Sequence, residues 1–157
     1  MTTTEKHLHR NLALIDIENI VGGPNAPSAI IDVARTLIAQ HLQHDERDQS
    51  IVALSHHAAR VAAFGWDRGT RQKWQSGQDG ADLALLEELD VEKIIGRFES
   101  ITIVSGDGIF GDAVERLRAE GIRATVIGRE RSISWRLYRA ADKVIELPDL
   151  VGYTSAA

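Results

Sequence analysis

Three aspartates occupy positions at which an α/β chain would bring their side chains together. Asp16 ends a short apolar run, Asp107 follows a run rich in β-branched residues, and Asp82 opens a helical pattern. Because parallel strands end at a common edge of their sheet, we expect these carboxylates to meet there. Crowded carboxylates repel one another unless a cation compensates, and Mg²⁺ or Mn²⁺ binds oxygen ligands of this kind. The pattern therefore indicates a metal site suited to phosphodiester hydrolysis.

Each aspartate also has a structural explanation, which the sequence leaves open. A carboxylate in a run as apolar as that of Asp16 must have a polar partner. Asp107 could shape a glycine-rich turn, while Asp82 could complement the helix dipole and Asp79 could cap the same helix. The agreement of three positions within one α/β order favours the metal site over three separate structural roles.

The elements that must position these residues follow from the alternation of apolar runs with helical spacings. Strands are predicted at residues 12–17, 50–55, 71–74, 100–105, 123–128 and 143–147. Helices are predicted at residues 30–42, 56–64, 81–98 with a break near Asp90, 111–120, and 132–141 with Ser132 as its cap. Strands separated by helices predict an α/β fold, in which a mostly parallel sheet of five or six strands is covered on both faces.

The composition fits one domain with a substantial core, since 43% of the 157 residues are apolar and 26% are charged. We expect this domain at residues 10–150, with flexible tails at 1–9 and 152–157. No apolar run is long enough for a membrane span or a secretory signal, and cysteine is absent. Without cysteine there are no disulfides, thiolate nucleophiles or Cys-ligated zinc, and we expect a cytoplasmic protein with no membrane partner.

The charges are unevenly distributed along the chain. The net charge of −5 disfavours a protein that coats nucleic acid in general. Residues 116–143 nevertheless carry eight basic and three acidic side chains. This segment could bind a phosphate polymer while the acidic remainder binds metal ions, or its charges could lie on solvated helix faces.

Three motifs resemble those of NYN domains, a branch of the PIN-like nuclease superfamily. They are Ile-Asp-Ile-Glu-Asn-Ile at 15–20, Gly-Ala-Asp-Leu-Ala-Leu-Leu at 80–86 and Val-Ser-Gly-Asp-Gly-Ile-Phe at 104–110, and the resemblance extends over roughly residues 10–148. It implies a three-layer α/β/α, PIN-like or Rossmannoid fold with a central parallel sheet. It also implies an acidic pocket that binds Mg²⁺ or Mn²⁺, and endoribonuclease activity on single-stranded or structured RNA.

The resemblance further implies roles for individual residues. Asp16, Asp82 and Asp107 would be metal ligands and catalytic residues. Asn19 would orient the substrate or a metal-bound water, and Ser105 would steady the turn that carries Asp107.

One position departs from the family pattern. The third NYN motif commonly has a second acid two residues after the first, and here Ile109 occupies that place. Asp112 is the nearest substitute and a further candidate for metal binding and catalysis, and Glu18 is another candidate ligand. The sequence leaves open whether one or two metals bind, and whether the chain is instead a non-catalytic RNA-binding or regulatory module.

Candidate substrate-binding residues also lie outside the motifs. Arg71 and Lys73, together with Arg68, stand between Trp66 and Trp74, a mixture that could bind single-stranded RNA by charge and stacking. The tryptophans could equally be core or subunit contacts.

Arg129 is a further candidate for phosphate binding, at the start of a segment that also holds three more arginines around the last predicted helix. Trp135, within that helix, is expected in the core. The histidine pairs at 7 and 9 and at 56 and 57 are expected to be incidental and not metal ligands.

Two other enzyme classes fit less well. Asp16 and Glu18 faintly resemble the aspartate motif of haloacid-dehalogenase-type phosphatases, but Glu replaces the second Asp and no lysine stands before the last acidic turn. A dinucleotide-binding domain is disfavoured because no Gly-Xaa-Gly-Xaa-Xaa-Gly follows the first strand. A homodimer and a regulatory protein partner are both left open.

Overall fold

The computed structural model describes residues 9–42, 45–55, 65–66, 69–74 and 80–150. Several predictions from the sequence fall outside these residues: the helix at 56–64 with its two histidines, Arg68, Asp79, the C-terminal tail, and the N-terminal tail up to residue 8, which includes His7. None of the helices in the described ranges is long and apolar enough to span a membrane.

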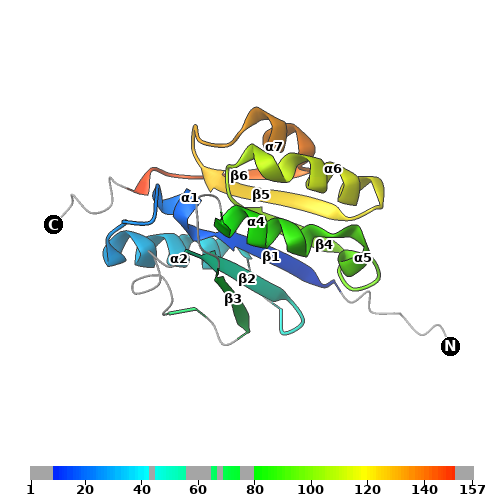
Figure 1. Cartoon of the computed structure of the whole chain (residues 1–157), viewed down its shortest axis with the longest axis horizontal. Helices are drawn as coiled ribbons and strands as arrows, with labels where there is room; N and C mark the ends of the chain where they lie inside the picture. Colours follow the sequence, from blue (N-terminus) through cyan, green and yellow to red (C-terminus); the bar gives the residue numbers. More distant parts are fainter. Residues whose placement is uncertain (1–8, 43–44, 56–64, 67–68, 75–79, 151–157) are drawn as a thin grey trace.

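A six-stranded, fully parallel sheet forms the centre of the molecule (Figure 1). Its strands are β1 (Asn11–Asp16), β2 (Gln49–Leu54), β3 (Thr70–Trp74), β4 (Ser100–Val104), β5 (Arg123–Arg129) and β6 (Lys143–Leu147). They lie in the order β3-β2-β1-β4-β5-β6. The chain therefore adds strands on one side of β1 and then returns to add the rest on the other side. The reversal falls between β1 and β4, which is where ligands bind in open α/β sheets.

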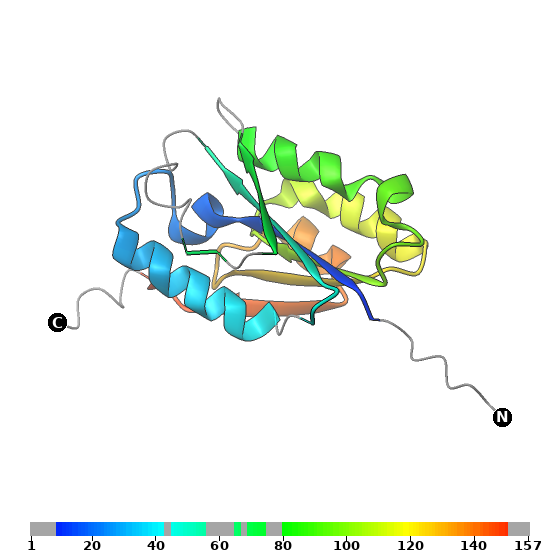
Figure 2. The same cartoon turned by 90° about the horizontal axis from the view of Figure 1, so that it is seen from below.

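Helices cover both faces of this sheet, as Figure 2 shows from below. One face carries α1 (Ile17–Val21) and α2 (Ser28–Leu42). The other carries α4 (Gly80–Leu86), η1 (Glu87–Leu89), α5 (Val91–Ile94), η2 (Gly108–Phe110), α6 (Gly111–Ala119) and α7 (Trp135–Ala140). The predicted three-layer α/β/α architecture is confirmed.

The apolar strand runs reflect two cores on opposite faces of the sheet. Along β1, Leu12 and Leu14 pack among the residues of α4, α6 and α7, while Ile15 packs among those of α2. A strand buried on both faces needs apolar residues at nearly every position, so its sequence shows a continuous run instead of an alternation. The apolar run of β1 stops at Asp16, which is the last residue of the strand.

One predicted helix agrees with the structure at its break, and another differs at its start. The break expected near Asp90 is present, because its carboxylate caps α5 by accepting a 2.9 Å hydrogen bond from the Glu92 N–H. The prediction that Ser132 caps the last helix was wrong. Its N–H closes a turn onto the Arg129 carbonyl, Arg131 adopts a φ of 61°, and α7 begins three residues later than expected.

Candidate active site

A polar cleft of about 350 Å³ opens at the carboxyl edge of the sheet. It lies beside the reversal of strand order, and it is lined by the ends of β1, β2 and β5, the start of α4 and the loop after β4. Its charged and amide side chains are Asp16, Glu18, Asn19, Asp82, Asp107 and Arg129. The tertiary structure thus brings together the aspartates of all three motifs.

Asp16 is the most deeply placed of these acids, with 3% of its surface exposed. It ends β1 and caps α1, since its carboxylate accepts a 3.3 Å hydrogen bond from the Asn19 N–H. The Ser105 hydroxyl donates a second bond, at 3.2 Å. Burial raises the pKa of Asp16, and these two donors act in the opposite direction. Two neutral donors orient this carboxylate without neutralising it.

The loop that carries Asp107 is held against α1 by a short hydrogen-bond network. The Ser105 hydroxyl accepts a 3.1 Å bond from the Asp107 N–H, and the Asn19 side-chain oxygen accepts a 2.8 Å bond from the Gly106 N–H. Asp107 in turn caps η2 by accepting a 3.0 Å bond from the Ile109 N–H. Because Oδ1 of Asn19 is used in this way, its amide NH₂ is the group it can present to the cleft.

Asp82 completes the acidic group from the first turn of α4. Its pKa is raised to about 9, first by burial and then by the neighbouring carboxyls of Asp16 and Asp107, which lie within hydrogen-bonding reach of it. At neutral pH Asp82 therefore keeps a proton between two other acids. None of the salt bridges among the described residues involves any of the three.

This donor set suits a hard divalent cation. Within the described ranges, no three acidic or histidine side chains are already arranged as the ligands of a metal ion. The raised pKa of Asp82 favours a proton on its carboxyl group next to Asp16 and Asp107, and a cation would take the place of that proton. Carboxylate oxygens in an open cleft are ligands that Mg²⁺ and Mn²⁺ accept while keeping positions for water and phosphate.

Arg129 brings a positive charge to the cleft from the end of β5. Its Nε atom is buried and has no hydrogen-bond partner among the described residues. One of its terminal nitrogens lies 3.4 Å from the place that a Cβ on Gly22 would occupy. A buried donor without a partner is costly unless a ligand satisfies it, and a phosphate oxygen has the right charge to do so.

Comparison with known proteins agrees with this geometry. The sequence matches the model of the NYN domain over residues 14–148. The chain belongs to the NYN family. It is 33% identical over 70 residues to the Low amplitude and bright protein LabA of Synechococcus elongatus, a match covering 45% of this chain and 38% of that protein. The fold resembles the crystal structure of a Vibrio parahaemolyticus protein of unknown function, with a TM-score of 0.61, 20% identity, and coverage of 92% of this chain and 96% of that one.

Other residues that the NYN motifs suggested lie apart from the acidic group. Asp112 forms a salt bridge with Arg136, both side chains being mostly exposed, and does not line the cleft. Glu18 does line it, but its carboxylate accepts bonds from the N–H and the hydroxyl of Ser55. The position two residues after Asp107 holds Ile109, which is exposed.

The basic residues of the β3 region are engaged with acids instead of facing the cleft. Arg71 and Lys73 form salt bridges with Glu88 at 3.3 and 2.6 Å, which tie β3 to η1. Trp66 packs against the core on the α2 side, with the Arg35 guanidinium over its ring at 5.8 Å. The expectation that Trp135 belongs to the core was wrong, because 69% of its surface is exposed.

The close packing of the segment before α7 on the Asp107 loop was not predicted. A Cβ on Gly106 would lie 2.3 Å from the Ser132 carbonyl oxygen, and one on Gly108 would lie 2.6 Å from the Ser134 hydroxyl. The Ser134 N–H also donates a 2.8 Å bond to the Gly106 carbonyl. The glycines on both sides of Asp107 were the available signal, since glycine permits such backbone approach.

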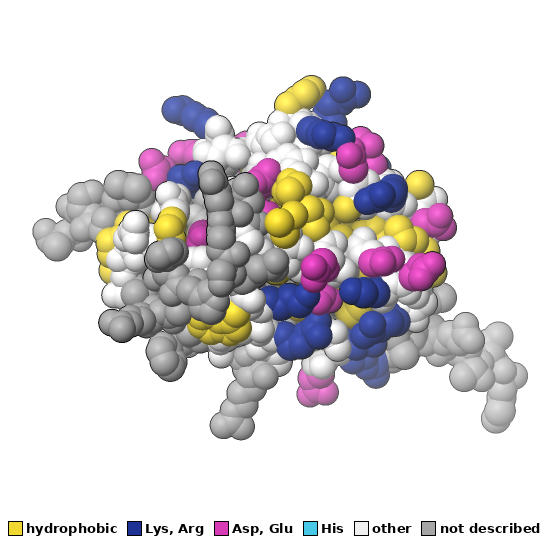
Figure 3. Space-filling model, viewed as in Figure 1, with side chains coloured by type: hydrophobic (Ala, Val, Ile, Leu, Met, Phe, Trp, Pro, Cys, Tyr) yellow, Lys and Arg dark blue, Asp and Glu magenta, His cyan; other side chains and the backbone are white. Residues whose placement is uncertain are grey.

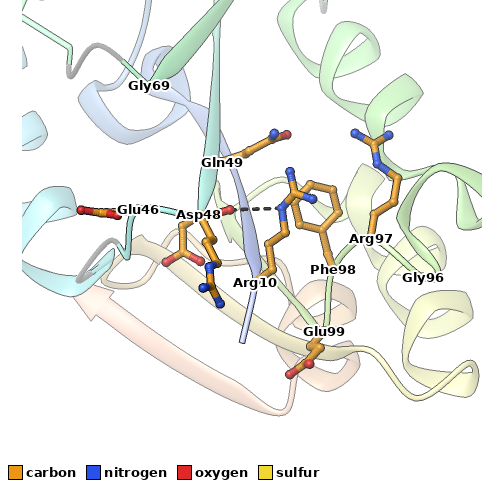
Figure 4. Close-up of a pocket in the computed structure, with 10 residues that line it drawn as sticks. Arg10, Glu46, Asp48, Gln49, Gly69, Gly96, Arg97, Phe98 and Glu99 are labelled. Carbon is orange, nitrogen blue, oxygen red and sulfur yellow. Dashed lines mark hydrogen bonds between the residues drawn. The ribbon is translucent and has the colours of Figure 1, made fainter. Parts of the chain in front are cut away.

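A larger hollow, of about 830 Å³, lies at the opposite edge of the sheet (Figure 4). Arg10 and Arg97 lie over the Phe98 ring at 4.8 and 5.6 Å, and the Arg10 side chain donates to the Arg47 carbonyl at 3.1 Å. None of the residues in the three NYN motifs lines it.

Proposed function

We propose that this NYN domain is a metal-dependent endoribonuclease that hydrolyses RNA phosphodiester bonds with Mg²⁺ or Mn²⁺. The observation that supports this most is the position of Asp82, whose carboxyl lies between those of Asp16 and Asp107 with its pKa raised to about 9. Three crowded acids that form no salt bridge within the described ranges cost folding energy, and groups perturbed in this way concentrate at functional sites.

The three aspartates would hold the cation. When bound, that cation would lower the pKa of a coordinated water and stabilise the charge that develops on the phosphate. Ser105 and the α1 backbone fix the orientation of the Asp16 carboxylate, and Asn19 fixes the loop of Asp107, so the ligands are positioned before substrate arrives.

Two side chains are suited to binding the RNA at this site. The buried Nε of Arg129 has no hydrogen-bond partner in the described part of the chain and can donate to a phosphate oxygen. The amide NH₂ of Asn19 lines the same cleft and can donate to the substrate or to water. Both act on the sugar–phosphate backbone, so the proposed cleavage does not depend on base identity at this point.

A second candidate is a non-catalytic RNA-binding or regulatory module. Ile109 in place of the usual second acid favours it, as does the engagement of Asp112 with Arg136 away from the cleft. In this case the domain would bind RNA without cutting it.

Incubation of the purified protein with labelled single-stranded RNA and Mn²⁺ tests the proposal. We expect internal cleavage by the natural chain, loss of cleavage in Asp16→Asn, and unchanged cleavage in Glu115→Gln, a control at an exposed acid of α6. Calorimetry of Mn²⁺ binding provides a second readout, in which Asp16→Asn should weaken binding while circular dichroism confirms its fold. Metal-independent RNA binding without cleavage by the natural chain would favour the second candidate.

A further inference from the structure

Two aromatic rings form an exposed stack on α7, the helix that begins next to the Asp107 loop. The Trp135 and Tyr138 rings lie 5.7 Å apart between centroids and are inclined by only 14°. Trp135 is 69% exposed and Tyr138 is 44% exposed. Leu137 and Ala140, on the opposite side of this helix, are buried in the core. The pair is therefore not needed to hold α7 on the sheet, and it leaves an aromatic face open to solvent.

The segment before the stack is joined to the Asp107 loop by a backbone hydrogen bond and a packing contact. Ser134, the residue before Trp135, donates its N–H to the carbonyl of Gly106, the residue before Asp107. The side chain of Ser134 also packs against Gly108, on the other side of Asp107. The start of α7 is thus held next to the loop that carries Asp107, a candidate metal ligand.

The surroundings of the rings are positively charged. Residues 129–139 contain four arginines and a single acid, Glu130. Arg131 and Arg139 are exposed, and Arg129 lines the cleft. Its Nε has no partner among the residues that the structure describes. Figure 3 shows hydrophobic and basic side chains together at the edge of the molecule over α7, at the top of the view. A second copy of this chain would bring arginines against arginines here, whereas a phosphate polymer would be attracted.

We propose that Trp135 and Tyr138 are a base-stacking platform, and that the substrate is RNA with an unpaired base next to the cleaved phosphate. The inference rests on the proposed function, because it takes the ligand of the cleft to be RNA. Aromatic side chains stack on the faces of bases in single strands, whereas the bases of an A-form duplex are already stacked on each other. The exposed Arg131 and Arg139 attract the phosphates of the bound strand, and the platform selects single-stranded over double-stranded RNA.

RNA binding measured in EDTA tests the platform separately from cleavage, because EDTA removes the metal on which the proposed cleavage depends. The anisotropy of a labelled short oligouridylate should show that Trp135→Ala weakens binding about 5- to 100-fold, as expected for loss of one stacked base. Trp135→Phe should recover most of the affinity. Trp74→Ala tests the other exposed tryptophan, at the end of β3, which the sequence also offered for stacking, and the inference expects it to change affinity less than about twofold.

A spectroscopic readout separates stacking from a structural effect. In a Trp66→Phe, Trp74→Phe double variant the remaining tryptophan is Trp135, since the chain has 3. Single-stranded RNA should quench its fluorescence, and duplex RNA of equal length should not.

Several outcomes would overturn the inference. One is equal binding of oligouridylate by Trp135→Ala and the natural chain, and another is a loss confined to Trp74→Ala. A third is a dimer in sedimentation that Trp135→Ala converts to a monomer with no change in RNA affinity. Failure to cleave RNA in Mn²⁺, with binding in EDTA still dependent on Trp135, would contradict the nuclease proposal and leave the platform standing.

Discussion

The two edges of the parallel sheet carry acidic side chains in opposite surroundings. At the edge where the strands begin, Glu99 lies 2.9 Å from the His9 ring, and the Asp48 carboxylate accepts a 2.8 Å bond from the Asn11 N–H. At the edge where the strands end, Asp16 and Asp82 face each other and have raised pKa values. The first arrangement lowers the electrostatic energy of the fold, and the second raises it.

This contrast distinguishes the candidate site better than the size of the hollows does. The hollow at the starting edge is the larger, about 830 Å³ against about 350 Å³. Its acidic side chains, however, are exposed or already have partners. At the ending edge, Asp16, Asp82 and Asp107 lie close together and form no salt bridge among the described residues. Acids in this situation are the ones that a divalent ion would stabilise.

The largest expected effect is that of Asp107→Asn, measured against the same change at an acid of the other edge, Glu99→Gln. Asp107→Asn removes a proposed metal ligand and should lower RNA cleavage at least about 100-fold. Glu99→Gln removes the same charge at the other edge and should leave the cleavage rate within about twofold. Initial rates in Mn²⁺ at matched protein concentration measure both. Equal losses in the two variants would contradict the assignment of the site to the ending edge.

Relative to Asp82→Asn, the natural chain should lose stability as pH rises and gain stability when metal is added. The raised pKa means that, between about 4 and 9, the folded chain retains a proton that the unfolded chain releases. Stability of the natural chain without metal therefore falls as pH rises through this window, and it is unaffected by Asp82 below it.

Asparagine has no charge to lose, so Asp82→Asn should be about 1–3 kcal/mol more stable than the natural chain at pH 8 in EDTA, a Tm increase of about 2–10 °C. The difference should vanish near pH 4. Added Mn²⁺ should stabilise the natural chain and not the variant. Thermal unfolding by circular dichroism measures these shifts, and a variant less stable than the natural chain at pH 8 would refute the raised pKa.

A smaller effect is expected from the amide that links the two site loops. Asn19→Ala removes the acceptor of the Gly106 N–H and should cost about 1–2 kcal/mol of unfolding free energy. Cleavage should fall about 10-fold, because Asp107 is less well held. Thr36→Val, which removes an exposed hydroxyl bonded to the Asp32 carbonyl on α2, should change neither property measurably. Urea unfolding and initial rates give the two values.

The smallest effect is expected at Asp112. Its salt bridge with Arg136 is largely exposed, so Asp112→Asn should change stability by less than about 1 kcal/mol and cleavage by less than about twofold. A loss of cleavage greater than about tenfold, with Mn²⁺ affinity reduced, would show that Asp112 reaches the metal and compensates for Ile109.

Much of the fold followed from local pattern. The runs around β1, β4 and β5 are apolar at nearly every position because both faces of these strands are buried, and such runs predict a parallel sheet covered by helices. The last helix was placed incorrectly at its start. Ser132 has the right residue type for a cap, but its N–H is used in a turn and its carbonyl packs over Gly106.

The sequence by itself determined the type and chain position of the site acids, since each strand end is marked by the end of an apolar run. Only the tertiary structure decided which charged and aromatic side chains are available for a ligand. Lys73 is paired with Glu88, Asp112 with Arg136, and Trp135 is exposed beside the loop of Asp107. These outcomes depend on partners 15 or more positions away in the chain, which local patterns of polarity do not encode.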